Sequence, residues 1–257
     1  MSASNVYSDV YPDVYSKMID YKDGDTVLEG YIAYDKTIKV KRPAVLIVHD
    51  WMGPGEFFYE KAQRLAKLGY VAFVADIYGK NVRPKDRAGA SNLAGTYKND
   101  RNLLRERVKA ALGYLQTVVG VDKQRIAAIG YCFGGTAVLE LARSGEELAG
   151  VVSIHGGLDT PDPKSSIIKT KVLVLQGADD PVTPPDIVKA FQDEMRQTGT
   201  DWQMVIYGNA VHAFTNPKAG NDNLKGAAYN EKADKRSWEA LKEFFKEVFE
   251  KCNYSDV

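Results

Sequence analysis

Short apolar runs alternate with stretches of helical character along most of the chain. Six of these runs have the length and the Val, Ile and Leu content typical of buried β-strands. They span 43–48, 70–75, 125–129, 150–154, 171–176 and 202–207. The expected helices span 56–68, 101–118, 186–197 and 225–249. This alternation predicts one α/β domain with a mostly parallel central sheet and helices on both faces.

Two segments depart from the alternation. The turn 21–25 lies between two partly alternating runs, 15–20 and 26–34, which predicts an antiparallel hairpin at the edge of the sheet. Residues 76–99 carry scattered glycines, a proline and charges without a clean period, and predict a long loop with short helical turns at most. Residues 1–14 are expected to be loosely ordered. No repeat or linker divides the chain, so a single domain over 1–257 is expected.

Composition and charge narrow the partners. The 257 residues are 44% hydrophobic and 26% charged, which suits one large domain. Lys plus Arg and Asp plus Glu both number 34, so no net field attracts nucleic acid or an anionic membrane, although a local basic patch can still form on the folded surface. Residues 1–20 lack the features of a secretory signal, and no run approaches the roughly 20 apolar residues of a membrane-spanning helix. A cytoplasmic protein without nucleic-acid or membrane partners is expected.

The strongest chemical signal is the pattern G-x-C-x-G-G, which Gly130 to Gly135 form around Cys132. A strand precedes the pattern and a helix follows it, so Cys132 is expected at a sharp, strained turn that holds its side chain exposed. At a helix N-terminus, free N–H groups and the positive end of the dipole favour thiolate over thiol. Cys132 is therefore the candidate nucleophile, and the N–H of Phe133 is a candidate donor to an oxyanion.

The alternative for Cys132 is a small buried structural cysteine behind a glycine turn. With 22 glycines and 2 cysteines in the chain, about 0.014 chance occurrences of G-x-C-x-G are expected, which favours the nucleophile. Cys252, in the polar C-terminal tail, lacks this context and is expected to be a bystander. Two cysteines are too few for a disulfide framework and no Cys/His metal spacing occurs, so neither a metal nor a cofactor is expected.

A nucleophile on such a turn needs a base and a group that orients the base, and these follow in the chain order acid, then histidine. Of the three histidines only His212 follows the candidate acids, in a short loop after the last strand; a surface histidine is the alternative. The acid is expected just beyond the strand 171–176, where Asp179 and Asp180 compete. Pro181 restrains the turn after Asp180, which favours Asp180 as the orienting carboxylate and Asp179 as a turn or cap residue.

The second oxyanion donor is expected in the loop that follows the strand 43–48, and the N–H of Trp51 is its candidate. His49 and His155 stand at strand ends. We interpret both as residues with structural hydrogen bonds, with pocket lining as the alternative.

From about Tyr21 onward the chain resembles the dienelactone hydrolase family of the α/β-hydrolase fold. The resemblance rests on the Gly130 to Gly135 motif, the Asp180 turn, the loop from Gly208 to Phe214, and the strand end Asp76 to Gly79, which is similar to the family's segment that leads into the substrate pocket. It implies the α/β-hydrolase fold and an activity on small esters or lactones.

Two positions depart from the family's pattern. The family partners its resting thiol with a glutamate that substrate binding displaces; the matching position is Asp50, so the resemblance implies Asp50 as the thiol partner. Members that cleave dienelactone bind the substrate carboxylate with arginines, one of them four residues after the catalytic histidine, and that position is Asn216 here. The strict dienelactone assignment is therefore weakened. The basic side chains left as replacements, if they do not lie on solvated faces, are Lys218, Arg83, Arg87, Arg101 and Arg105.

The sequence thus predicts a hydrolase, monomeric or homodimeric, that cleaves a small lactone or ester. In this hypothesis Cys132 forms an acyl-enzyme thioester, which water activated by His212 resolves. Two alternatives stay open: a broad-specificity carboxylesterase of the same fold, and a non-catalytic thiol protein that senses redox state or binds a ligand.

Overall fold

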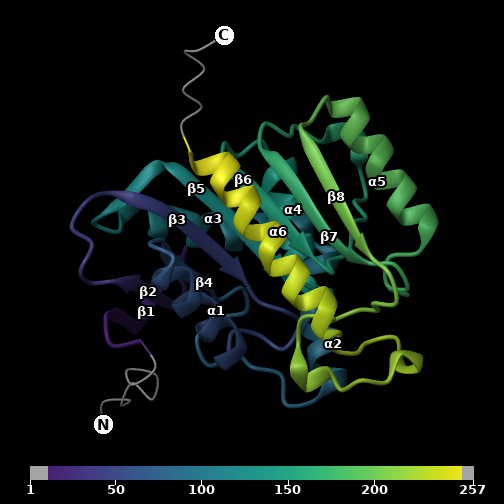
Figure 1. Ribbon diagram of the computed structural model, residues 1–257, viewed down its shortest axis with the longest axis horizontal. Coiled ribbons are helices and arrows are strands. Elements are labelled where there is room, and N and C mark those ends of the chain that lie inside the picture. The colour runs from purple at the N-terminus through teal and green to yellow at the C-terminus, as the bar shows by residue number, and fades with distance from the viewer. Residues whose placement is uncertain (1–10, 251–257) are drawn as a thin grey trace.

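The computed structural model describes residues 11–250, which form an eight-stranded sheet with helices on both faces (Figure 1). The sheet order is β1-β2-β4-β3-β5-β6-β7-β8. The strands are β1 Val14–Asp23, β2 Thr26–Asp35, β3 Arg42–Val48, β4 Val71–Ala75, β5 Val121–Tyr131, β6 Gly150–Ile154, β7 Lys171–Gly177 and β8 Trp202–Tyr207. Cys252 and residues 1–10 of the expected loose segment lie outside the described residues.

The antiparallel hairpin is confirmed at the edge of the sheet. Asp23 pairs with Thr26, so the turn is tighter than expected and consists of Gly24 and Asp25, with Gly24 at φ 54°. β2 is antiparallel to β4, and every other neighbouring pair from β4 to β8 is parallel. The carboxyl ends of β3, β5, β6, β7 and β8 therefore meet at one edge, where open α/β sheets bind their ligands.

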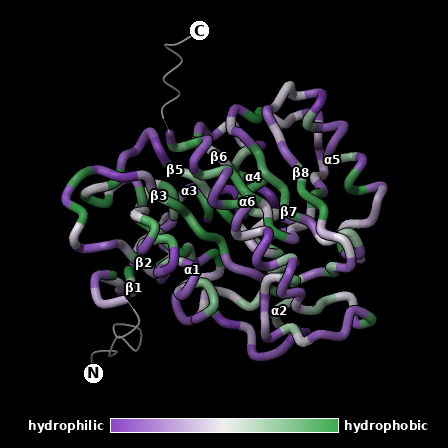
Figure 2. Tube along the Cα trace, viewed as in Figure 1, coloured by the Kyte–Doolittle hydropathy of each residue, from purple (hydrophilic) through white to green (hydrophobic). Residues whose placement is uncertain are grey.

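The helices cover the two faces of the sheet and enclose two hydrophobic cores. Alternate strand residues face α1 and α6 on one side, and α2, α3, α4 and α5 on the other. The helices are α1 Glu56–Lys67, α2 Arg87–Asn99, α3 Arg101–Thr117, α4 Phe133–Arg143, α5 Pro185–Thr198 and α6 Glu231–Phe249, with short 3₁₀ turns at Pro163–Ser165, Pro217–Ala219 and Asn223–Lys225. The hydrophobic central strands and the more polar outer turns are seen in Figure 2. No helix within residues 11–250 is long and apolar enough to cross a membrane.

The expected loop over 76–99 is wrong in its second half, because Arg87–Asn99 is a regular helix. The Asp86 carboxylate caps it by accepting from the N–H of Gly89, and its buried residues Ala90, Ala94 and Tyr97 follow helical spacing. Small residues and glycines dilute this apolar stripe, which is why the sequence pattern concealed it.

The last helix also begins later than expected, at Glu231 rather than near 225. The Asn230 side chain caps it by accepting from the N–H of Ala233. Before this cap, the N–H of Ala228 donates to the carbonyl of His212, and the N–H of Asn230 donates to that of Phe214. Residues 228–230 therefore pair with the loop that carries His212 and do not extend the helix.

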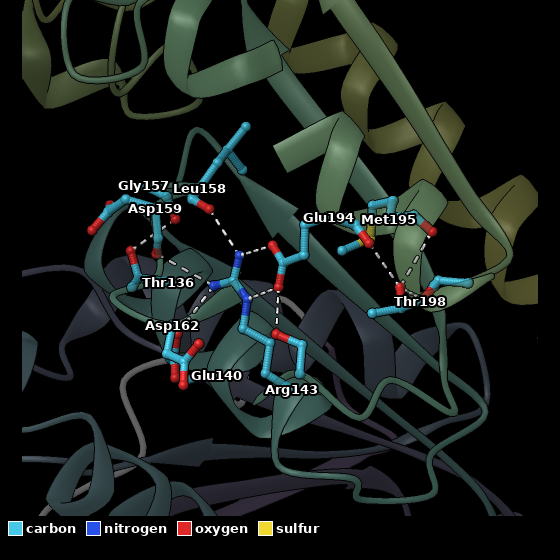
Figure 3. A network of polar contacts seen from close by, with 12 residues as sticks. Thr136, Glu140, Arg143, Gly157, Leu158, Asp159, Asp162, Glu194, Met195 and Thr198 are labelled. Atoms are coloured by element: carbon cyan, nitrogen blue, oxygen red, sulfur yellow. Dashed lines mark hydrogen bonds and ion pairs between the residues drawn. The ribbon is translucent and has the colours of Figure 1, made fainter. Parts of the chain in front are cut away.

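A buried polar network joins α4 to α5 (Figure 3). The guanidinium of Arg143 donates to both carboxylate oxygens of Glu194 at 2.7 and 2.8 Å, and to Glu140 at 3.1 Å. It also donates to the carbonyl of Leu158 at 2.8 Å. Arg105 of α3 pairs with Glu140 from the other side. Every buried charge here has an opposite partner, as the low dielectric of the interior requires.

Candidate active site

Cys132 lies at the turn between β5 and α4, with φ 54° and ψ −113°. A positive φ is unfavourable for a residue with a side chain, so surrounding contacts must hold the turn in place. The N–H of Cys132 donates to the carbonyl of Ile154 at 3.0 Å, and the N–H of Gly135 donates back to the carbonyl of Cys132 at 3.0 Å. The thiol is half-buried, at the N-cap of α4.

Two flanking glycines make this turn possible. A Cβ atom on Gly130 would lie 1.9 Å from the carbonyl oxygen of Gly134, and one on Gly134 would lie 2.2 Å from that of Val48. Both distances are far inside van der Waals contact. The motif therefore has glycines because the backbones of β3, β5 and α4 approach each other too closely for any side chain.

The structure brings Cys132, His212 and Asp180 together from three separate segments. Nε2 of His212 lies 3.0 Å from Sγ of Cys132, and Nδ1 of His212 lies 2.9 Å from Oδ2 of Asp180. Asp180 is 3% exposed, whereas the neighbouring Asp179 is exposed to solvent. Of the two aspartates that the sequence left in competition, Asp180 is therefore the one in contact with the imidazole.

Backbone contacts align the acid and histidine loops. The N–H groups of Ala178 and Asp179 donate to the carbonyls of Tyr207 and Ala210 at 2.9 and 3.0 Å. A Cβ atom on Gly177 would lie 2.4 Å from the carbonyl oxygen of Ala210, so this crossing too requires glycine. The carboxyl ends of β7 and β8 are thus locked together, which sets the separation of Asp180 and His212.

Asp180 has two further partners that the sequence did not reveal as site residues. The side-chain amide of Gln176 donates to Oδ2 at 2.8 Å, and the N–H of Val182 donates to Oδ1 at 2.9 Å. Gln176 is 1% exposed at the end of the apolar strand β7. A polar residue in a buried run, four positions before the acid, was the available signal.

The pKa of His212 is raised to about 10. Burial by itself would lower this pKa because it penalises the charged imidazolium, but hydrogen bonds to Asp180 and Cys132 and the charges of these two groups outweigh it. The site therefore favours a protonated imidazole at neutral pH.

The loop after β3 contains the predicted residues Asp50 and Trp51. Oδ1 of Asp50 accepts from the N–H of Met52 at 2.8 Å, and burial raises the pKa of Asp50 to about 6 against the opposing effects of Met52 and His212. Within residues 11–250 no hydrogen bond joins Asp50 to Cys132, whose thiol contacts His212 instead. The Tyr78 hydroxyl donates to the carbonyl of Trp51 at 3.0 Å and holds the loop from the β4 side.

The other two histidines are buried and differ in their surroundings. His49 accepts from the N–H of Ile77 at its Nε2, so it donates from Nδ1 to the carbonyl of Asp50; burial lowers its pKa to about 4. This is the structural hydrogen bond expected of a strand end. His155 contacts the Thr215 hydroxyl at 2.9 Å, lies 5.3 Å from the His212 ring between centroids and lines the same cavity. Burial lowers the pKa of His155 as well, so both rings are neutral.

A cavity of about 940 Å³ opens at Cys132. α2 and the loop that carries His212 form part of its wall and lie side by side at the lower edge of Figure 1. Phe133, Trp51, Asp50 and Asn216 also line it. Of the site residues expected from the sequence, Cys132, His212, Phe133, Trp51 and Asp50 therefore face one space, whereas Asp180 does not line it and contacts His212 instead.

Four basic side chains line the cavity: Arg87, Lys98, Lys218 and Lys225. Lys225 pairs with Asp222 at 3.8 Å, whereas within residues 11–250 the other three have no carboxylate partner. Arg87 lies over the Trp51 ring, 5.8 Å from its centroid. The remaining arginines named above are occupied elsewhere: Arg83 contacts Asp76, Arg101 pairs with Asp159 and Arg105 pairs with Glu140.

Comparison with known proteins gives a consistent result. The sequence pattern of the dienelactone hydrolase family matches residues 28–249. A dienelactone hydrolase-like promiscuous phosphotriesterase from metagenomic libraries is 39% identical, with a TM-score of 0.88, over 93% of this chain and 100% of its own.

Two relatives are more distant. A protein of Aquifex aeolicus with the name "Putative carboxymethylenebutenolidase" is 24% identical over 90% of this chain and 97% of its own. A Bradyrhizobium protein named as a probable 2-oxo-3-(5-oxofuran-2-ylidene)propanoate lactonase is 28% identical over 76% of this chain and 84% of its own. An acylaminoacyl peptidase of Pyrococcus horikoshii, at 14% identity and a TM-score of 0.73, shares the fold alone.

Proposed function

Because the chain belongs to the dienelactone hydrolase family, and is therefore a hydrolase, we propose that it cleaves small carboxylic esters or lactones with Cys132 as its nucleophile. One observation carries this proposal. His212 contacts the thiol through one ring nitrogen at 3.0 Å and the buried Asp180 through the other at 2.9 Å. A nucleophile, a base and a carboxylate that orients the base have this geometry in unrelated hydrolases.

The first half of the reaction acylates the cysteine. The Cys132 thiolate attacks the carbonyl carbon, and a C–S bond forms as the carbonyl electrons move to oxygen. N–H groups of Phe133, the first residue of α4, and of Trp51 donate to this oxyanion. The intermediate collapses, the C–O bond breaks, and the leaving alkoxide takes a proton from the imidazolium of His212.

The second half releases the acid. Neutral His212 accepts a proton from water, the resulting hydroxide attacks the thioester carbonyl, and the C–S bond breaks to return the thiolate. Asp180 keeps the His212 ring in the orientation that both steps need. A thiolate is itself a good leaving group, so activated esters and enol lactones react, whereas amides with poor leaving groups do not.

Asp50 is proposed as the carboxylate that partners the Cys132 thiol before substrate binds. It lies in the same cavity as Cys132 and its pKa of about 6 places its titration close to neutral pH. Protonated, it donates a hydrogen bond to a nearby anion; ionised, it repels one. The charge of Asp50 therefore sets how readily an anionic substrate or the thiolate is accommodated.

The unpaired cations Arg87, Lys98 and Lys218 favour substrates that carry a negative charge. They take the place that the resemblance gives to an arginine at Asn216, whose side chain instead accepts from the N–H of Lys218 at 2.9 Å. A panel of nitrophenyl esters matched in size, with and without a free carboxylate, tests this. We expect a higher kcat/KM for the carboxylates and a loss of that preference, with neutral esters unaffected, in Arg87→Gln.

The decisive experiment replaces the proposed nucleophile. Cys132→Ala is expected to abolish hydrolysis of nitrophenyl acetate, and the wild-type protein is expected to release one equivalent of nitrophenol in a burst as the thioester forms. Cys252→Ala is the matched control and should retain both. Unchanged turnover in a folded Cys132→Ala variant would end the proposal.

The same experiment separates the alternatives. A redox sensor would react with oxidants at Cys132 but show no burst with the ester. A broad carboxylesterase would show the burst but no preference for charged acyl groups. The 39% identical relative is named for phosphotriester hydrolysis, so a nitrophenyl phosphate triester belongs in the panel as a second activity of the same thiol.

A further inference from the structure

A second cavity, of about 470 Å³, lies at the amino ends of the parallel strands. Arg42 and Gly120, next to the starts of β3 and β5, line it together with residues of β1, β2 and the end of α3. It shares no lining residue with the cavity at Cys132. Strand β3 (Figure 1) runs from one cavity to the other and spans about 20 Å, at roughly 3.3 Å a residue. The two cavities therefore lie at opposite edges of the sheet.

The charge of this cavity is one-sided. Lys17, Lys36, Lys39 and Arg42 line it, and no Asp or Glu of the described part of the chain does. Within residues 11–250 none of the four forms an ion pair. The ammonium groups of Lys36 and Lys39 donate only to the backbone carbonyls of Pro12 and Lys36. In a chain with no net charge, four cations gathered without ion-pair partners form a local field that attracts anions.

Arg42 is the one buried residue among the four cations that line the cavity. It is 8% exposed, and its Cζ lies 5.6 Å from the centre of the Tyr34 ring, which fixes the guanidinium plane. Among the described residues, only Nη1 has a hydrogen-bond acceptor, the carbonyl of Asp35 at 2.7 Å, and Nε is buried without a partner there. The Asp35 carboxylate accepts from Thr37, and even if its charge is counted an excess of three positive charges remains. A buried guanidinium with free donors is a ready receptor for a phosphate or carboxylate.

The rest of the wall is apolar. Ile19, Ile32, Ile38 and Val118 line it with the rings of Tyr34 and Tyr114. A bare inorganic anion would leave this surface unused, whereas a ligand with an apolar or aromatic body would cover it. The volume lies within the range of about 300–1,000 Å³ that is typical of small-molecule sites.

We propose that this cavity binds a small organic polyanion with an aromatic body, of the size and charge of a nucleoside diphosphate. Its phosphates would contact Arg42 and the three lysines, and its ring would lie against the tyrosines and isoleucines. The site is separate from the catalytic centre and its occupation does not depend on the reaction proposed there.

Calorimetric titration of the full chain with ADP, phenyl phosphate and inorganic phosphate tests the proposal. We expect saturable 1:1 binding of ADP that weakens at least tenfold when salt is raised from 50 to 200 mM, because exposed charges are screened. Phenyl phosphate should bind more weakly than ADP, and inorganic phosphate at least tenfold more weakly.

Variants locate the binding. Lys17→Gln/Lys39→Gln should weaken ADP binding at least tenfold and leave ester hydrolysis unchanged. Both lysines are exposed, so the fold is not at stake. The control Lys123→Gln/Lys232→Gln makes the same charge change at exposed lysines outside the cavity and should alter ADP affinity by less than twofold. Arg42→Lys keeps the charge but loses the planar guanidinium with its parallel N–H donors, and should weaken ADP binding as well.

Four results would overturn the proposal. These are no saturable binding of ADP, equal losses in both lysine pairs, inorganic phosphate as tight as ADP, and ADP inhibition of ester hydrolysis that persists in Lys17→Gln/Lys39→Gln and so belongs to the catalytic cavity. Tighter binding of duplex DNA or of anionic vesicles through the same lysines would assign the patch to a macromolecule instead.

Discussion

At the scale of single residues, burial distinguishes groups that the sequence leaves equivalent. Asp179 and Asp180 are adjacent and chemically identical, yet only Asp180 is enclosed, hydrogen-bonded by Gln176 and Val182, and in contact with His212. Burial also raises the pKa of Asp50 to about 6 and lowers that of His49 to about 4, because it disfavours the charged form of each group. Side-chain identity gives the chemistry that is available, and the surroundings decide which state is populated.

The two aspartates provide a matched pair of variants. Asp180→Asn should lower kcat for an activated ester by about 10²–10⁴-fold, because the amide no longer stabilises the imidazolium or holds its tautomer. It should also lower the pKa of His212, since the hydrogen bond to Asp180 is a main cause that raises it. Asp179→Asn should leave both unchanged. Steady-state kinetics and NMR titration of His212 measure the two effects, and equal losses in the two variants would contradict the assignment.

Asp50 is expected to reduce stability above its own pKa. The folded-state pKa of about 6 is raised from 3.8, so protonation favours the fold at low pH and this contribution is lost as pH rises through about 6. Asp50→Asn removes the buried charge and should raise the free energy of unfolding at pH 7.5 by about 1–3 kcal/mol. The gain should shrink toward pH 4. Urea unfolding at both values checks this, and a gain independent of pH would disprove the cause.

At the scale of elements, the site is built where β3, β5 and α4 approach most closely. The approach depends on missing side chains at Gly130 and Gly134, and on a strained Cys132 that the surrounding backbone holds in place. The turn at Gly130 to Gly135, called the elbow below, is therefore a property of three packed elements and of no single one. Its stability is expected to respond sharply to one added methyl group.

Gly134→Ala tests this dependence. The new Cβ would lie 2.2 Å from the carbonyl oxygen of Val48, so we expect a loss of about 1–3 kcal/mol or more in the free energy of unfolding, with activity lost in the protein that still folds. Gly113→Ala, in α3 with no atom within 4 Å of its Cβ, is the control and should stabilise the helix by about 0.5–1 kcal/mol. Thermal unfolding of both variants gives the comparison. Equal behaviour would show that the elbow tolerates a side chain.

At the scale of the whole molecule, one sheet separates two cores and also two sites. The cavity at Cys132 lies at the carboxyl ends of the parallel strands and the basic cavity at their amino ends. On the α2–α5 face, the buried Arg143 network ties the elbow helix α4 to α5 and to the chain near Leu158 (Figure 3).

Breaking this network should affect the entire fold. Glu194→Gln removes the carboxylate that accepts from Nε and Nη2 of Arg143 and leaves a buried guanidinium under-compensated, at a cost of about 3 kcal/mol in the free energy of unfolding. Asp193→Asn removes an exposed carboxylate from the preceding position of α5 and should cause no measurable loss. Chemical denaturation with two spectroscopic probes checks both. A similar result for the two would mean that burial of the pair contributes nothing.

The sequence by itself determined which segments become strands, and it contained the motif around the proposed nucleophile, Cys132. Apolar runs reveal strands because burial on both faces is a local requirement, and the expected bounds agree with β3, β4, β6, β7 and β8 to within one residue. The glycines of the Gly130 to Gly135 motif identify the elbow, because a turn at which backbone segments approach so closely leaves no room for side chains. The position of His212 after the acids follows from chain order alone.

Tertiary structure decided what depends on distant neighbours. The sequence did not predict helix α2, because its narrow stripe of Ala90, Ala94 and Tyr97 is recognisable as an apolar face only once it is buried against the core. The contact of Gln176 with Asp180 depends on how the chain turns after β7. Arg87 and Lys98 line the cavity only because α2 packs beside segments that are distant in the sequence. The basic cavity gathers residues from 17 to 120 into one space. Burial and electric field are sums over atoms close in space, so no stretch of the chain contains them.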